Sequence, residues 1–297
     1  MKVHLISLLL ILGLASKLGE ASSQGIYIVV GIPPISGITN SLKSEMDSID
    51  LILPIGTDPH TFDLSPSILE KLSRADIFLH TRFPFELKTA KALEQIRTKV
   101  ECLDVTHGVK WRRITYQDNH HTHNDTEDTG LDLHCWLSPE NIKIIAKNIF
   151  EELVRKNKAN APEYEKNYLR FLKRVDEVDQ KVKRQLEPYK GKKFYVYHPA
   201  FGYFADTYYL QEVYIEVEGM SPSIREIKKT IDKAKLEGVK TIYIQPQFDR
   251  KPADAIAEAI GGKVEVLNDL GEDVLQTLMD TADKLSTEFA SRVSQNQ

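Results

Sequence analysis

The chain has 297 residues, of which 41% are hydrophobic and 28% charged, and its formal net charge at pH 7 is −4. This composition excludes collagen-like, low-complexity and wholly disordered chains, and it supplies enough apolar surface for about two domains. Charges of both signs are mixed along the chain, which excludes the basic surface that nucleic-acid binding requires. The 2 cysteines are too few for a disulfide scaffold or for a zinc module built on cysteines alone.

The first residues have the pattern of a secretory signal peptide. A weakly positive start, residues 1–4, precedes an apolar run at residues 5–16, which is shorter than the ~18–20 residues of a spanning helix. Small residues at Gly19 and Ala21 then fit a cleavage site near Ala21. We assign residues 1–23 to a signal peptide, with an uncleaved membrane anchor as the alternative. We therefore expect an exported protein, in the periplasm or on the outer cell surface.

Short apolar runs in the first half have the composition of buried strands. They alternate with helical stretches such as residues 66–74, which is typical of parallel βαβ units. The first run ends in residues 31–37, whose glycines and prolines predict a turn. The predicted strands are residues 25–30, 49–52, 77–80 and 100–105.

The strongest periodic pattern lies in residues 161–188. Apolar residues recur there at steps of three and four, which places them on one face of a long helix. They are Tyr164, Tyr168, Phe171, Val175, Val178, Val182 and Leu186.

The second half repeats the alternation of strands and helices. One predicted helix, at residues 223–237, begins with a capping box in which Glu226 follows Ser223 by three residues. A further helix is predicted at residues 252–260, and the predicted strands are residues 194–197, 212–216, 241–244 and 264–267.

These elements predict an α/β protein with two lobes joined by a single long rigid helix. The first lobe with its loops covers residues 24–160, the linking helix 161–188 and the second lobe 189–297. A ligand pocket is expected between the lobes, at the ends of the strands.

Three histidines stand where predicted strands end or helices begin. His60 follows a strand, His134 precedes a helix and His198 directly follows a strand. Any one of them alone is typical of a structural histidine, but three at the ends of elements indicate a shared site. Neutral imidazole is a ligand for Zn²⁺, Cu²⁺ and other late divalent metals.

Five segments of the chain have the motifs and spacing of a known family. They are Asp58-Pro-His-Thr-Phe, His134-Cys-Trp-Leu-Ser-Pro-Glu-Asn, His198-Pro-Ala-Phe-Gly-Tyr-Phe, Glu218-Gly-Met-Ser-Pro-Ser and Gln245-Pro-Gln-Phe. In this order, and joined by the long helix, they resemble the metal-binding solute-binding proteins of zinc and manganese ABC transporters, the group called cluster A-I. The resemblance covers about residues 25–290.

The resemblance implies two (β/α)4-like lobes that hold a metal ion between them through His60, His134 and His198. It also implies that the ion is a transported ligand and that the partner is an ABC permease in the membrane. We expect Zn²⁺, with Mn²⁺ as the alternative, because Mn²⁺ prefers more oxygen ligands than a site with three imidazoles offers. We further expect a monomer that binds no nucleic acid.

The fourth ligand stays open, because the chain departs from the family pattern there. The family usually has a carboxylate in a Leu-Asp-Pro-Leu-like segment, whereas residues 267–271 read Leu-Asn-Asp-Leu-Gly. The ligand position falls on Asn268 by register. The three alternatives are the side-chain carbonyl of Asn268, the carboxylate of Asp269, and a water molecule.

A His-rich stretch, residues 118–134, forms a second candidate feature. His120, His121 and His123 stand among several carboxylates in a segment too polar to pack. The resemblance implies weak secondary metal capture or a sensor of metal abundance. The alternative is a solvated loop with incidental histidines.

The main interpretation, capture of a metal without chemistry on a substrate, predicts that the chain is not an enzyme. A zinc hydrolase is a weaker alternative, because no His-Glu-Xaa-Xaa-His helix is present. A surface adhesin is the other alternative. Cys102 and Cys135 are either bonded to each other, as an exported protein allows, or both free.

Overall fold

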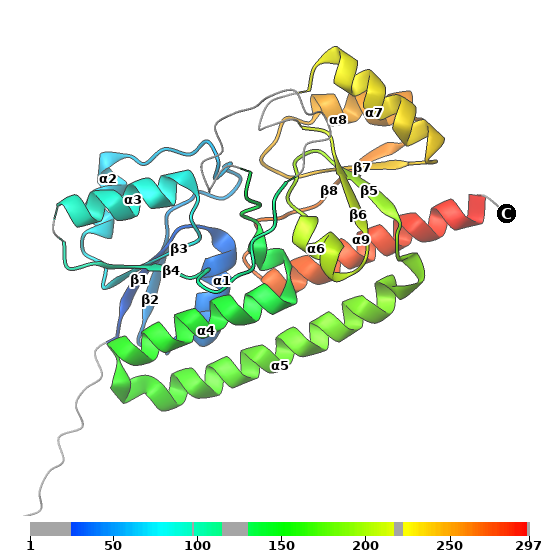
Figure 1. Ribbon diagram of the computed structural model, residues 1–297. Helices are drawn as coiled ribbons and strands as arrows, with labels where there is room; N and C mark the ends of the chain where they lie inside the picture. The colour runs from blue at the N-terminus through cyan, green and yellow to red at the C-terminus, as the bar shows by residue number, and fades with distance from the viewer. Residues whose placement is uncertain (1–24, 97, 115–129, 217–221, 296–297) are drawn as a thin grey trace, which may run out of the picture.

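The structure is a computed structural model that describes residues 25–96, 98–114, 130–216 and 222–295 (Figure 1). The predicted signal peptide, residues 1–23, lies outside these residues. Of the helices in the described ranges, none has the length and apolar character needed to cross a membrane.

The first lobe is built on a parallel sheet with the strand order β2-β1-β3-β4. Figure 1 shows α2 and α3 on one side of this sheet, with α1 and α4 on the other. The strands are β1 (Tyr27–Val30), β2 (Ser48–Leu51), β3 (Ile77–His80) and β4 (Glu101–Asp104), and the helices are α1 (Pro33–Leu42), α2 (Pro66–Leu72), α3 (Pro84–Gln95) and α4 (Pro139–Lys156).

The second lobe repeats this topology with the order β6-β5-β7-β8, again all parallel. Helices α7 and α8 pack together, and Figure 1 shows them on the side of this sheet away from α6 and α9. The strands are β5 (Lys193–Val196), β6 (Gln211–Tyr214), β7 (Thr241–Ile244) and β8 (Lys263–Val266), and the helices are α6 (Gly202–Thr207), α7 (Ile224–Leu236), α8 (Lys251–Ala259) and α9 (Val274–Gln295).

All eight predicted strands are present within one or two residues, and so is the capping box at Ser223 and Glu226. The predicted turn at residues 31–37 is wrong, because α1 begins at Pro33. Proline at the first positions of a helix lacks only an N–H that has no partner there, and its fixed φ suits the helix. The two prolines therefore start a helix where the pattern indicated an irregular segment.

The predicted long helix is α5 (Ala161–Leu186), which packs against α4, α9 and α1. Its apolar face is buried at Tyr164, Phe171, Val175, Val182 and Leu186 and half-buried at Tyr168 and Val178. The predicted fold class is therefore confirmed. The division at residues 160 and 189 stays a prediction, because α9 at the end of the chain also contacts α1 of the first lobe.

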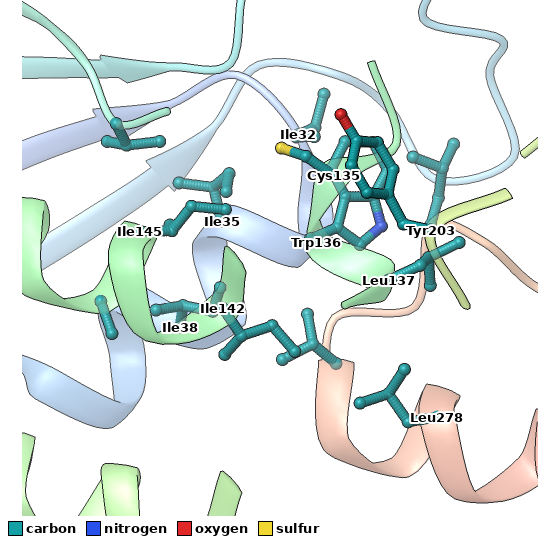
Figure 2. Packing of buried hydrophobic residues seen from close by; sticks show 14 of the residues in the cluster. Ile32, Ile35, Ile38, Cys135, Trp136, Leu137, Ile142, Ile145, Tyr203 and Leu278 are labelled. Atoms are coloured by element: carbon teal, nitrogen blue, oxygen red, sulfur yellow. The ribbon is translucent and has the colours of Figure 1, made fainter. Parts of the chain in front are cut away.

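One large hydrophobic core extends through both lobes. It contains the first sheet, α4, α5 and α9, together with α6 and the adjoining face of β5. Figure 2 shows the place where they meet, around the short 3₁₀ helix η1 (Cys135–Leu137): Ile35 comes from α1, Tyr203 from α6 and Leu278 from α9. A smaller cluster fills the space between the second sheet and α7 and α8. The lobes therefore share apolar packing as well as a linking helix.

We expect Leu278→Ala to lower the free energy of unfolding by about 2–5 kcal/mol, because Leu278 is fully buried in the shared core and its truncation leaves a cavity. The matched control is Leu236→Ala on α7, where the leucine is 89% exposed and the effect should stay within about 0.5 kcal/mol. Urea unfolding followed by circular dichroism measures both. Equal effects of the two substitutions would contradict the shared core.

Candidate metal centre

Three histidine rings lie close together between the lobes, at the edges of the two sheets where the carboxyl ends of the strands lie. His60 follows β2, His134 precedes η1 and His198 follows β5. Their ring centroids lie 5.0–5.5 Å apart, and one ring nitrogen from each lies within 4.8 Å of the other two. Because zinc–nitrogen bonds are ~2.0–2.1 Å long, small side-chain adjustments bring all three nitrogens onto one ion.

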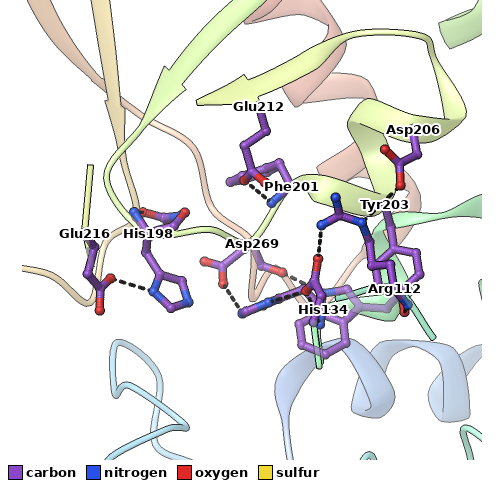
Figure 3. Close-up of polar contacts among 12 residues, drawn as sticks. Arg112, His134, His198, Phe201, Tyr203, Asp206, Glu212, Glu216 and Asp269 are labelled. Carbon is purple, nitrogen blue, oxygen red and sulfur yellow. Dashed lines mark hydrogen bonds and ion pairs between the residues drawn. The ribbon is translucent and has the colours of Figure 1, made fainter. Parts of the chain in front are cut away.

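Two buried carboxylates hold the other nitrogen of two of these rings. Asp132 Oδ1 lies 3.0 Å from His134 Nδ1, and Glu216 Oε2 lies 2.6 Å from His198 Nδ1. A carboxylate there fixes the neutral tautomer whose Nδ1–H donates, which leaves the Nε2 lone pair for a metal. Consistent with this, His198 Nε2 is buried and without a hydrogen-bond partner in the described residues. Figure 3 shows Glu216 beside the ring of His198.

His60 is positioned by its own loop. Its backbone N–H donates to Asp58 Oδ1 at 2.9 Å, and the hydroxyl of Thr61 donates to the other carboxylate oxygen of Asp58. This turn explains why the aspartate stands two residues before the histidine. His60 is the most exposed of the three histidines, so its side of the cluster is the side open to solvent.

The rings differ in their tendency to take up a proton. Desolvation, followed by the neighbouring His134 and His198, lowers the pKa of His60 well below its usual range. For His134, burial lowers the pKa, but the hydrogen bond and charge of Asp132 outweigh it, so the pKa is raised. His60 therefore takes up a proton less readily than an ordinary histidine, and His134 more readily.

The structure brings Asp269, and not Asn268, to the histidines. Asp269 is 1% exposed, and its Oδ2, which has no hydrogen-bond partner in the described residues, lies 3.7 Å from His134 Nε2. Its backbone carbonyl accepts a hydrogen bond from Trp136 Nε1 at 2.7 Å. Asn268 is exposed, and its Oδ1 accepts the N–H of Leu270. Of the two candidate side chains, Asp269 thus has the oxygen that faces the cluster.

The segment after β7 supports the site at three points. The side chain of Gln245 contacts both backbone groups of His198, at 3.3 Å and 2.7 Å. Gln247 Nε2 donates to Asp269 Oδ1 at 3.0 Å, and the ring of Phe248 stacks on the ring of His198 at 4.9 Å. These contacts give each polar or aromatic residue of the Gln-Pro-Gln-Phe motif a role in holding a histidine or a carboxylate.

A strained turn closes the first-lobe side of the cluster. Arg82 has φ 78°, a conformation that costs a non-glycine residue energy. The buried carboxylate of Glu86 holds this turn, because its Oε2 accepts from Thr81 N, Thr81 Oγ1 and Phe83 N. The turn places the ring of Phe83 edge-on to His60 at 5.0 Å and beside His134 at 6.1 Å. Phe83 is fully buried and forms an apolar wall of the site.

The remaining predicted residues have different outcomes. His120, His121 and His123 lie outside the described residues. Cys102 and Cys135 are both free, so the disulfide alternative is wrong.

The supporting residues Asp132, Glu216, Phe83 and Trp136 are not among those predicted from the sequence. Asp132 stands two residues before His134, which is a local signal. Glu216 is brought to His198 only by the pairing of β5 with β6.

A family model described as "Zinc-uptake complex component A periplasmic" matches residues 28–288. The high-affinity zinc uptake system protein ZnuA of Bacillus subtilis (strain 168) is 28% identical over 267 residues, which cover 87% of this chain and 83% of that protein. The manganese ABC transporter substrate-binding lipoprotein PsaA of Streptococcus anginosus is 26% identical over 82% of this chain and 80% of its own length.

Solved structures agree with the fold. A crystal structure of ZnuA superposes with a TM-score of 0.81 and 30% identity, over 89% of this chain and 99% of that chain. The laminin-binding protein Lmb of Streptococcus agalactiae, described as a bifunctional protein with adhesin and metal transporting activity, gives a TM-score of 0.78 at 24% identity, over 89% of this chain and 99% of that chain. At that identity the likeness to Lmb concerns the fold alone.

We expect Glu86→Gln to change how stability depends on pH. Burial raises the pKa of Glu86 to about 7, although three hydrogen bonds oppose the shift. The folded state therefore keeps a proton that the unfolded state loses above its ordinary pKa of ~4.3, so stability falls as pH rises from ~4.3 to about 7, by about 4 kcal/mol. Glutamine has no such proton.

Urea unfolding of both proteins at several pH values between 4.5 and 8 tests this. The free energy of unfolding of the wild type relative to Glu86→Gln should decrease through that window. Two parallel pH profiles would contradict the assignment.

Proposed function

Because the chain belongs to the family of periplasmic zinc-uptake components A, we propose that it captures Zn²⁺ between its two lobes and delivers it to an ABC permease. The observation that carries this proposal is the convergence of His60, His134 and His198, with one ring nitrogen of each close to the other two.

The proposed ligands are the three histidines and Asp269. A carboxylate beside three neutral imidazoles reduces the positive charge of the bound ion, which an asparagine or a water molecule would not do. The buried, unpartnered Oδ2 of Asp269 next to His134 supports this choice over Asn268. Three nitrogens and one oxygen match the four-coordinate preference of Zn²⁺.

The supporting residues keep the site ready for the ion. Asp132 and Glu216 orient two rings and keep Nε2 free, and Phe83 limits water on one side. The ion would enter and leave past His60, the most exposed ligand. The shared core and the linking helix favour small tilts of the lobes over a wide hinge rotation.

We infer that the chain carries a metal rather than transforming a substrate, because its family is one of uptake components. The carboxylates nearest the histidines support this inference. Asp132 and Glu216 are engaged with imidazole nitrogens, and Asp269 is a proposed ligand of the ion, so none of the three is placed as a general base for a hydrolase.

Export by the predicted signal peptide would bring the chain to the outer side of the cytoplasmic membrane, where the permease takes up the ion. We propose that the chain acts there as a monomer. In the His-rich stretch, the residues His120, His121 and His123 would bind the metal weakly before it reaches the main site.

Isothermal titration with Zn²⁺ tests the proposed ligands. The wild type should bind one equivalent, His198→Ala should lose that binding, and Asp269→Ala should weaken it by about 10-fold or more because the site loses a negative ligand. Asn268→Ala is the matched control one residue away and should bind like the wild type. Loss of binding in Asn268→Ala with normal binding in Asp269→Ala would reverse the assignment.

Competition between metals tests the choice of ion. A modest excess of Mn²⁺ should leave the bound Zn²⁺ in place, because three imidazoles suit zinc better than manganese. Metal analysis of the dialysed protein measures the outcome. Replacement of zinc by manganese under these conditions would identify a manganese protein.

A further inference from the structure

Arg112 contacts both the second lobe and the partner of a proposed metal ligand. Its Nη1 donates to Asp132 Oδ2 at 2.7 Å, and its Nε donates to Asp206 Oδ2 on α6 at 3.0 Å. Its backbone N–H donates to the hydroxyl of Tyr203, also on α6, at 3.0 Å. Figure 3 shows the guanidinium between Asp206 and the residues around His134.

Asp132 links Arg112 to His134, because it bonds to both residues. The carboxylate is fully buried and uses one oxygen for Arg112 and the other for the ring and backbone nitrogens of His134. A buried carboxylate without a cationic partner is strongly unfavourable, so the orientation of Asp132, and with it that of His134, depends on Arg112. The backbones of Arg112 and Asp132 are also bonded, because Asp132 N donates to Arg112 O at 3.0 Å.

The start of α6 is shaped to admit the guanidinium. A Cβ atom on Gly202 would lie 1.6 Å from Arg112 Nη1 and 2.2 Å from its Cζ. Any side chain at position 202 would therefore displace the guanidinium. The glycine brings Arg112 against the backbone of the second lobe.

We propose that Arg112 is a positioning residue that couples the metal affinity of His134 to the contact between α6 and the first lobe. The inference rests on the proposed function and adds a residue that touches neither the ion nor its ligands. Asp206 is 65% exposed at its side chain and bonds to Arg112 rather than to Asp132. Asp206 therefore affects metal affinity only through Arg112. Because coupling between two binding equilibria is reciprocal, a bound metal in turn strengthens the contact between Arg112 and α6.

The test is the zinc dissociation constant of four proteins, measured by competition with a chelating dye: wild type, Arg112→Gln, Asp206→Asn and the double variant. Arg112→Gln should raise the dissociation constant by about 10–100-fold, as loss of an outer partner of a ligand histidine does. Asp206→Asn should raise it about two- to fivefold, as expected for an exposed ion pair. In the Arg112→Gln background the Asp206 substitution should have no further effect.

Two further substitutions distinguish the geometry of the two Arg112 contacts from the effect of its charge. Arg112→Lys keeps the charge, but an ammonium group cannot reach Asp132 and Asp206 at once as the planar guanidinium does. It should therefore bind zinc more tightly than Arg112→Gln but less tightly than the wild type, and adding Asp206→Asn to it should have no effect. Arg74→Gln removes the same charge from an exposed ion pair with Glu70 that precedes β3, and it should bind zinc like the wild type. Melting temperatures of the metal-free proteins show that each variant is folded.

Gly202→Ala tests the same coupling with Arg112 itself unchanged. It displaces the guanidinium without removing it, and should weaken zinc binding by about 10-fold or more. Wild-type affinity in both Gly202→Ala and Asp206→Asn would overturn the coupling and leave the proposed function intact. Absence of zinc binding in the wild type would overturn the proposed function, and the coupling with it.

Discussion

A buried imidazole can offer one nitrogen to a metal only if the protein satisfies the other. In this chain Asp132 does so for His134 and Glu216 for His198. Each carboxylate brings its own requirement, because a buried charge must itself be bonded or balanced. Asp132 meets that requirement through Arg112, which lies against the second lobe. The candidate metal centre is therefore continuous with the polar contacts that join the two halves of the molecule.

The sequence predicts the parts of the fold that depend on local patterns. The eight strands are short apolar runs, and the buried face of α5 repeats every three or four residues from Tyr164 to Leu186. His60 and His198 are predictable from the sequence because parallel strands place the residues after their carboxyl ends at one edge of a sheet, and His134 is predictable because it directly precedes a helix. Their family motifs supported the same interpretation.

The sequence does not predict what depends on contacts between distant segments. Glu216 contacts His198 because β6 pairs with β5, and no local sequence pattern predicts which strands pair. Asp269 is held beside His134 through Trp136, more than one hundred residues earlier, whose indole donates to the backbone carbonyl of Asp269. The turn predicted at residues 31–37 is wrong because Pro33 and Pro34 suit the start of a helix as well as a turn, and α1 begins there.

The bond between Trp136 and Asp269 has a consequence for the thermodynamics of metal uptake. It fastens a segment of the second lobe to the first beside the histidine that would share the ion, through two atoms that are not themselves proposed ligands. The conformational entropy of bringing these groups together is therefore lost during folding, and little of it remains to be lost when the ion arrives. Selectivity in such a preorganised cage rests on the charge and softness of its donor atoms more than on a change of shape.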